Sequence, residues 1–104
     1  MSQSYSGGFI VATTTGVTVT TSGASASVSI PVASDGSRPR FLRIAATTES
    51  YFKIGVAGVT ATNQDILVQP ADAVILAIPS GITTLAYIQG TSSGKVNLIA
   101  LESI

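Results

Sequence analysis

The sequence contains no cysteine, no histidine and no tryptophan. Without cysteine the chain cannot form a disulfide, and no thiol is present to act as a nucleophile or as a metal ligand. Without histidine it lacks the commonest general base and the commonest ligand of transition metals. The usual serine and cysteine nucleophile arrangements therefore cannot be built, although serine and threonine are abundant. We expect a protein that is not an enzyme, with no cofactor, no metal ion and no small-molecule substrate.

Charged side chains are also scarce. Only 10% of the 104 residues are charged, against about 25% in an average soluble domain. Five basic and five acidic residues give a net charge of zero, so there is no electrostatic reason to expect nucleic acid or an acidic membrane as a partner. The longest apolar run, AVILAIP at residues 73–79, is far shorter than the roughly 20 residues that span a bilayer.

The hydrophobic fraction is 45% and the mean hydropathy is +0.52, which leaves few charged side chains to cover the surface of one domain. One interpretation is a β-protein of the secreted type whose surface is rich in serine and threonine. The other is that much of the exterior lies against copies of the same chain or against a larger assembly. We favour the second interpretation.

Apolar residues recur at every second position along most of the chain, which is typical of half-buried β-strands. The alternation is clearest at residues 24–30 and returns at residues 17–20 and 51–56. Residues 73–78, AVILAI, are apolar on both faces and predict a strand in the middle of a sandwich or barrel. A last strand is expected from residue 95 to about residue 101, and no segment shows an apolar stripe at helical spacing.

Turn signals separate these runs. Asp35-Gly36 predicts a tight turn, Gln69-Pro70-Ala71-Asp72 a type I turn, and Pro79-Ser80-Gly81 a type II turn. Thr91-Ser92-Ser93-Gly94 predicts a hairpin between residues 87–88 and the closing strand. About eight strands at this regular spacing predict an all-β fold, a single antiparallel β-sandwich that is jelly-roll-like.

The domain is expected to span residues 9–104, with no linker and no internal repeat. The first eight residues, MSQSYSGG, are small and polar and predict a flexible N-terminal arm, which in an assembly would reach a neighbour. The N-terminus has no basic leader and no long apolar core, so no signal peptide is expected. The protein should stay in the cytoplasm of the cell that makes it, or leave that cell inside a particle.

Acidic residues offer one catalytic alternative. Asp65 and Asp72 bracket the segment ILVQPA, and a pair of carboxylates could serve as an acid–base dyad. The structural interpretation is that Asp65 ends a loop and Asp72 caps a turn. The spacing of the two residues matches no calcium-binding loop, and the glycines form no phosphate-binding motif.

Half of the charged residues lie close together in the sequence, between residues 38 and 53. In an extended strand Arg40 and Arg43 point to opposite faces, which counts against a nucleic-acid groove. If residues 47–49 form a hairpin connection, Lys53 neighbours Arg43 or pairs with Glu49. The cluster is either a solvated edge with a local ion pair or an intersubunit contact, since arginine is enriched at protein interfaces. The candidate interface residues are Arg38, Arg40, Arg43, Glu49 and Lys53.

Aromatic residues suitable for stacking are few. Tyr5, Tyr51 and Tyr87 are far apart in the sequence and do not by themselves form a surface for sugars or bases. A lectin-like β-sandwich that works with few aromatics nevertheless stays open as an alternative. It predicts a concave pocket with Tyr51 or Tyr87 at its floor.

Residues 38–102 carry an ordered series of strand and turn motifs. RFLRIA (40–45) leads to FKIG (52–55). The turn PAD (70–72), an apolar strand that ends in PSG (79–81), and the closing strand GKVN (94–97) follow. In this layout the chain resembles small all-β structural proteins encoded among the head genes of tailed bacteriophages.

The resemblance implies a capsid decoration, or cement, protein located in the virion. Such proteins bind the outside of the expanded head shell, often as dimers or trimers at symmetry axes, and hold the capsomers against internal DNA pressure. The implied partners are the major capsid protein and copies of the chain itself, and no shell-contacting residue is carried over. The alternatives are a receptor- or glycan-binding module of a tail fibre, a head–tail joining protein, and a small enzyme.

Overall fold

The computed structural model describes residues 10–11, 15–34, 36, 38–70 and 72–103. The predicted N-terminal arm, residues 1–8, lies outside this range. The described part of the chain consists of strands, turns and loops, and it contains no helix that could cross a membrane.

Nine strands occur in the described residues. β1 has only two residues, so the eight longer strands match the number that the sequence predicts. Their bounds are β1 (Ile10–Val11), β2 (Val17–Thr20), β3 (Ala26–Ser29), β4 (Phe41–Ala46), β5 (Ser50–Gly55), β6 (Ile66–Val68), β7 (Val74–Ala77), β8 (Thr84–Gln89) and β9 (Lys95–Ser103).

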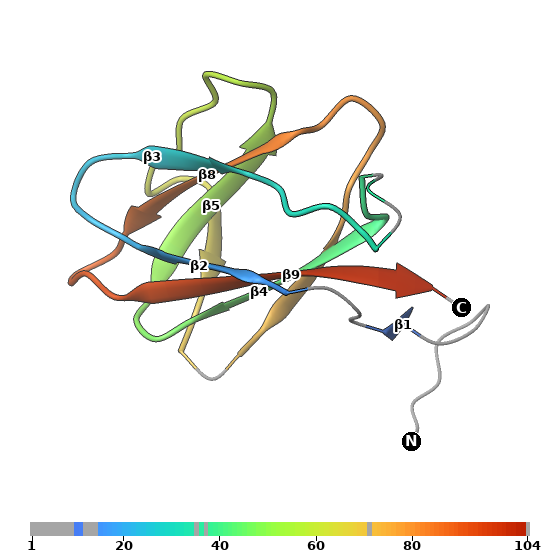
Figure 1. Ribbon diagram of the computed structural model, residues 1–104. Coiled ribbons are helices and arrows are strands. Elements are labelled where there is room, and N and C mark those ends of the chain that lie inside the picture. Colours follow the sequence, from blue (N-terminus) through green and yellow to red (C-terminus); the bar gives the residue numbers. More distant parts are fainter. Residues whose placement is uncertain (1–9, 12–14, 35, 37, 71, 104) are drawn as a thin grey trace.

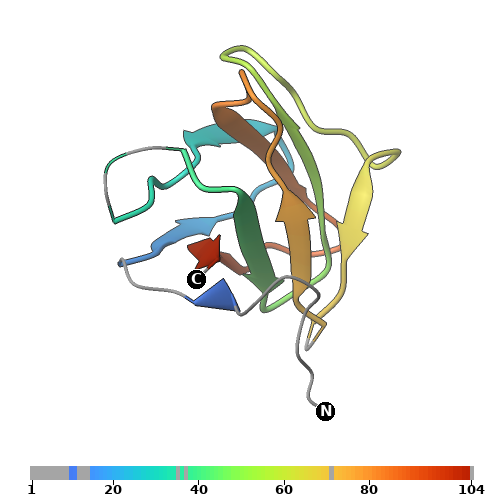
Figure 2. The same cartoon turned by 90° about the vertical axis from the view of Figure 1, so that its right-hand side faces the viewer.

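The strands form two antiparallel sheets that face each other (Figures 1 and 2). One sheet has the order β1-β9-β4-β7, with β2 also paired to β9, and the other has the order β3-β8-β5-β6. Within them β2 pairs with β9, β3 with β8, β4 with β7 and β5 with β6, as in one long hairpin wrapped into two layers. This is the strand order of a jelly roll. The predicted all-β, jelly-roll-like sandwich is confirmed.

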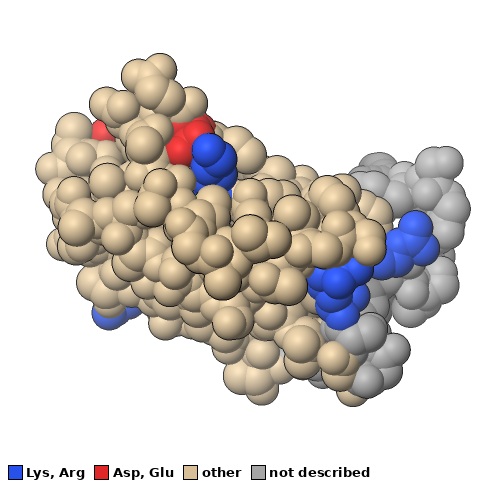
Figure 3. Space-filling view, turned by 90° about the horizontal axis from the view of Figure 1, so that it is seen from above, with Lys and Arg blue, Asp and Glu red and all other residues tan. Residues whose placement is uncertain are grey.

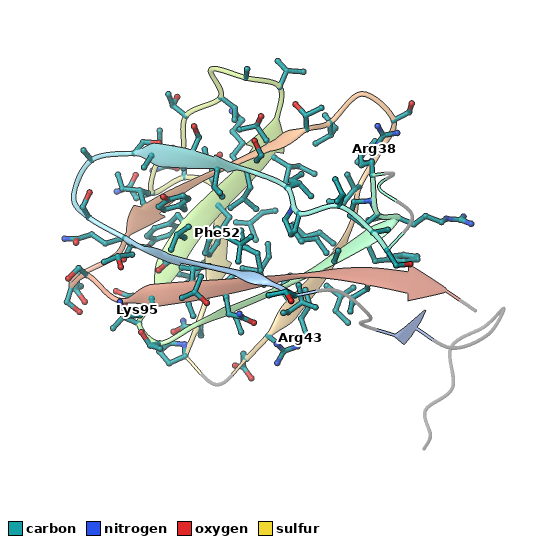
Figure 4. All side chains as sticks on the ribbon, in the orientation of Figure 1. Arg38, Arg43, Phe52 and Lys95 are labelled. Carbon is teal, nitrogen blue, oxygen red and sulfur yellow. The ribbon has the colours of Figure 1, made fainter. Side chains whose placement is uncertain are left out.

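The core lies between the two sheets and consists mostly of apolar side chains. Phe52 lies in the middle of the sandwich (Figure 4) and has no exposed surface. Leu42, Ile44, Leu85 and Leu98 are also fully buried, and burial of each such side chain contributes about 1.5–3 kcal/mol. The inward side chains of these strands occur at every second position, as the period-two pattern predicts, although the pattern does not say which of two apolar faces is inward.

The two loops that the sequence assigned to hairpins connect different sheets instead. Residues 47–49 carry the chain from β4 in one sheet to β5 in the other, and residues 90–94 carry it from β8 back to β9. These hairpin predictions are wrong, because a short polar loop between two strands is compatible with a hairpin and with a crossing between layers alike. As a result, β4 and β5 lie in separate sheets and are not paired.

The two crossing loops lie against each other at one end of the sandwich. Gly90 N donates to the carbonyl oxygen of Glu49 at 3.0 Å, and Thr47 N donates to that of Lys95 at 2.9 Å. The Lys95 amide in turn donates to Thr47 Oγ1 at 2.9 Å. These bonds satisfy backbone groups that no strand ladder reaches, and they hold the two sheets together at this end.

β7 is an edge strand. It lies within residues 73–78, AVILAI, which the sequence assigned to the middle of the fold. It pairs only with β4, and its outward residue Ile75 is 44% exposed. The prediction of a central strand is therefore wrong. A strand that is apolar on both faces is usually covered on both sides by its own domain, but here the outer face is uncovered.

Two of the predicted turns are present. Asp72 N donates to the carbonyl oxygen of Gln69 at 3.2 Å, and Ile82 N donates to that of Pro79 at 3.3 Å. Gly81 has a φ of 90°, the left-handed value that a type II turn requires at its third position. The third turn contains Asp35, which lies outside the described residues.

Candidate functional site

The structure does not bring the five predicted interface residues together. Arg38 and Arg40 are exposed and precede β4, and Arg43 is half-buried within β4. Glu49 lies in the crossing loop, and Lys53 is exposed on β5 of the other sheet. Figure 4 shows Arg38 and Arg43 well apart, and Figure 3 shows basic side chains at separate places on a mostly uncharged face. None of the described charged residues forms an ion pair.

Arg43 stands out because of its neighbours. β4 lies between β7 and β9, and the register places Arg43 directly opposite Ile75 on one side and Ile99 on the other. Phe41, two residues earlier on β4, shares this outward face. Phe41 and Ile99 are half-buried and Ile75 is exposed. We call these four residues the Arg43 face.

Among the described strand positions, no acidic residue shares the outward face with Arg43. The outward positions of β2, β4 and β7 and the described ones of β9 are apolar, hydroxylic, amidic or basic. Away from Arg43, Asn97 Nδ2 donates to Thr18 Oγ1 and Lys95 Nζ donates to Thr20 Oγ1, each at 3.3 Å. Arg43 therefore has an apolar register partner on each side, and it forms no ion pair within the described residues.

The edge strands β6 and β7 also expose apolar side chains. β6 is the edge of one sheet and β7 the edge of the other. On β6, Ile66 is 42% exposed and Leu67 is 39% exposed, and on β7 Ile75 is 44% exposed. Neither strand contains a lysine, a proline or any charged residue, although these are the usual means of blocking edge pairing. We call these three residues the apolar edge.

A loop covers part of the outer face of the other sheet. Residues 56–65 leave β5, and Ala61 N donates at 2.8 Å to Ser25 Oγ beside β3, on the far side of β8 (Figure 2). Ala86, an outward residue of β8, has no exposed surface although no sheet lies above it. The loop turns at Gly58, which has a φ of 95°. It thus folds back over the β5–β8 pair.

Asp65 fixes the end of this loop. Its Oδ2 accepts hydrogen bonds from the Thr62 amide at 2.8 Å and from Thr62 Oγ1 at 3.3 Å. Asp72 lies in the exposed turn before β7. The structural interpretation of Asp65 is confirmed. In the described residues no three histidine, cysteine, aspartate or glutamate side chains gather as a metal site.

Beside this loop lies a hollow of about 530 Å³. Tyr51 and Ile88, which are register partners on the outward face of β5 and β8, form its floor. Glu49 lies directly over Gly90, where an added Cβ would come within 2.8 Å of Glu49 Oε1. The residues that line the hollow are Glu49, Tyr51, Ala61, Thr62, Asn63, Ile88, Gln89, Gly90 and Thr91.

The sequence pointed to part of this hollow. Tyr51 is one of the two tyrosines that the lectin-like alternative placed at a pocket floor, whereas Tyr87 is in the core with 8% exposure. Glu49 was a candidate for a different reason, as a charged interface residue. Asn63, Gln89 and Thr91 carry no local signal, because they come together only when two loops and two strand ends meet. Gly90 is the kind of residue that allows such a close approach, because an added Cβ there would collide with the Glu49 side chain.

Comparisons with known proteins found no family model, no curated protein and no solved structure that matches the chain. The topology defines its class as an antiparallel jelly-roll sandwich. That fold carries many functions, so function has to be argued from the surfaces themselves.

Proposed function

We propose that the protein is a non-enzymatic structural component of a virion, a decoration protein that binds the head shell of a tailed bacteriophage and copies of itself. The sequence resemblance over residues 38–102 and the scarcity of charge support this role. The jelly roll is compatible with it, since the fold occurs in viral capsid proteins.

The observation that carries the proposal is the setting of Arg43. Arg43 is half-buried between two isoleucine register partners, and its guanidinium forms no hydrogen bond or ion pair within the described residues, so it is available to a carboxylate of a partner. Arginine in an apolar surround is a common centre of binding energy at protein interfaces, and it bonds a carboxylate through two parallel hydrogen bonds. The partner that fits is a protein surface with apolar side chains around one exposed carboxylate.

The apolar edge supplies a second surface for copies of the chain. Exposed isoleucine and leucine on uncharged edge strands favour pairing with another strand or another apolar surface. Each contact needs only modest affinity, because several linked contacts around a symmetry axis raise the effective concentration of every one of them. Slow release from the shell then follows from multivalency.

The test is co-sedimentation with emptied heads of the phage that encodes the chain. Arg43→Ala should weaken binding by about tenfold or more, as expected for a central interface arginine. Lys53→Ala is the matched control, because it removes the same charge from an outward strand position of the opposite sheet. The proposal would be refuted if the two substitutions weakened binding equally. It would also be refuted if the unmodified protein did not bind the heads. Thermal unfolding of each variant excludes loss of the fold as the cause.

A further inference from the structure

The hollow beside loop 56–65 presents several polar groups that the protein itself does not use. In the described structure no hydrogen bond involves the side chains of Glu49, Tyr51 or Thr91. The Asn63 Oδ1 atom accepts one long bond, 3.4 Å from Gln64 Nε2, which leaves the Asn63 amide nitrogen without an acceptor. Because none of the described buried polar atoms lacks a partner, these groups are open to solvent in the hollow.

The charge of the lining excludes some ligands. No lysine and no arginine lines the hollow, and Glu49 is its single ionisable acid. A phosphate, a sulfate or an acidic sugar would meet a carboxylate without a neighbouring cation and would be repelled. A neutral ligand that donates to Glu49 fits these groups better.

The floor of the hollow is apolar while its walls are polar. The ring of Tyr51 lies between Ile88 and Leu67 in the register of the sheet. Above it the walls offer the Glu49 carboxylate, the Asn63 amide and the hydroxyl groups of Thr62 and Thr91. Amides and hydroxyls both donate and accept, and a carboxylate accepts. The matching ligand has an apolar face and an edge of neutral groups that donate and accept, which is the chemistry of a sugar ring.

We infer that this hollow is a binding site for a neutral glycan, with one sugar ring stacked on Tyr51 and its hydroxyl groups bonded to Glu49 and Asn63. Its volume, about 530 Å³, lies within the range of roughly 300–1,000 Å³ that is usual for ligand pockets. The walls are held in place before binding, because the Asp65–Thr62 bonds and the Ala61–Ser25 bond fix the loop. Binding therefore costs little ordering of the loop.

The placement of the site separates it from the proposed shell contact. The hollow opens on the outer face of the β3-β8-β5-β6 sheet, whereas the Arg43 face is the outer face of the other sheet. One copy could bind a shell with one face and display the hollow on the opposite face. The site thus adds a function, attachment to sugars, that does not depend on the shell contact.

The test is binding of the full chain to an array of neutral and acidic glycans, followed by titration calorimetry with the best neutral oligosaccharide. Tyr51→Ala and Asn63→Ala should each weaken binding, the first by about tenfold, because a stacked ring is lost. Lys53→Ala, on the same strand but outside the lining, should leave the affinity unchanged. Thermal unfolding checks the fold, and the exposed loop residue Asn63 gives a variant that does not alter the sheet.

Two outcomes would overturn the inference. One is that no neutral glycan binds the folded protein at millimolar concentration, or that acidic glycans bind more tightly than neutral ones. The other is glycan binding that Tyr51→Ala and Asn63→Ala leave intact. The co-sedimentation experiment with heads is independent of both, so failure of the glycan site is distinguishable from failure of the decoration role.

Discussion

Gly90 and Gly94 flank the loop from β8 to β9, and both lie against the crossing segment that leaves β4. A Cβ at Gly94 would overlap Thr48 Oγ1 and would lie 2.7 Å from Thr47 Oγ1. Gly94 also binds Thr21, whose Oγ1 accepts from the Gly94 amide at 2.9 Å and whose own amide donates to the Gly94 carbonyl at 2.8 Å. The backbone at Gly94 therefore has no freedom to move away from an added side chain.

We predict that Gly94→Ala destabilises the protein by about 1–3 kcal/mol, the usual cost of overpacking a tight contact. Urea unfolding followed by circular dichroism measures the change. Gly23→Ala is the control, since nothing lies closer than 3.8 Å to its Cβ position, and it should alter the stability by no more than about 0.5 kcal/mol. A stable Gly94→Ala variant would mean that the two crossing loops are not packed together.

The sequence identified single residues unevenly. Arg43 and Glu49 attracted attention because charge is rare in this chain, and each belongs to a surface with a proposed function. Phe41, Ile75 and Ile99, which give Arg43 its setting, were assigned to strands without any sign that their side chains are outward. Alternation shows that two side chains point to opposite faces, but not which of two apolar faces is covered.

At the scale of elements, β6 and β7 are the notable strands, because each is the free edge of a sheet and neither carries a charge. Most proteins block such edges with lysine, proline or a bulge. Neither β6 nor β7 contains a lysine or a proline, which is consistent with an edge that other protein covers in the assembled state. Self-association is the property that this arrangement predicts.

Leu67→Lys should reduce self-association of the protein at high concentration, because a charge on the edge strand opposes pairing. Sedimentation velocity over a range of concentrations measures the effect. Val56→Lys places the same charge at a residue that is 60% exposed in loop 56–65, and it should leave the association unchanged. If the unmodified protein is monomeric at every concentration, the apolar edge is not a contact between copies.

Strand positions were largely predictable, whereas strand partners were not. The period-two runs gave β2, β3, β5 and the closing strand within a few residues, because each strand must place alternate side chains in one core. The error at residues 47–49 made neighbours of β4 and β5, which lie in different layers. A short loop fixes the distance between two strand ends but not the sheet that the second strand enters.

At the scale of the whole molecule, the two outer faces of the sandwich differ in chemistry. One carries Arg43 among apolar neighbours, with Lys95 and hydroxyl and amide groups further along it, and the other carries a polar hollow with one carboxylate beside a folded loop. A net charge of zero means that no long-range field draws the protein to a charged partner. The proposed association with a shell would therefore depend on apolar area and on one short-range ionic contact.

Binding to heads should accordingly persist at high ionic strength. At about 1 M salt the Debye length is about 3 Å, so contacts between exposed charges are screened while apolar burial is not weakened. Co-sedimentation at increasing salt measures this, with a strongly basic protein as a control that should be released. Release of the unmodified protein together with the control would show that the contact is electrostatic and that the apolar surfaces are not used.

The sequence by itself determined the class of structure, the absence of the usual histidine and cysteine chemistry, and the residues of each strand that share a face, because these follow from composition and from the two-residue period of an extended chain. Only the tertiary structure decided that the AVILAI run supplies an edge strand, that Arg43 and Lys53 lie on opposite sides, and that Tyr51 meets Asn63 and Gln89 around one hollow. These outcomes depend on pairings between residues far apart in the sequence, which the packing of one shared core selects and no local pattern encodes.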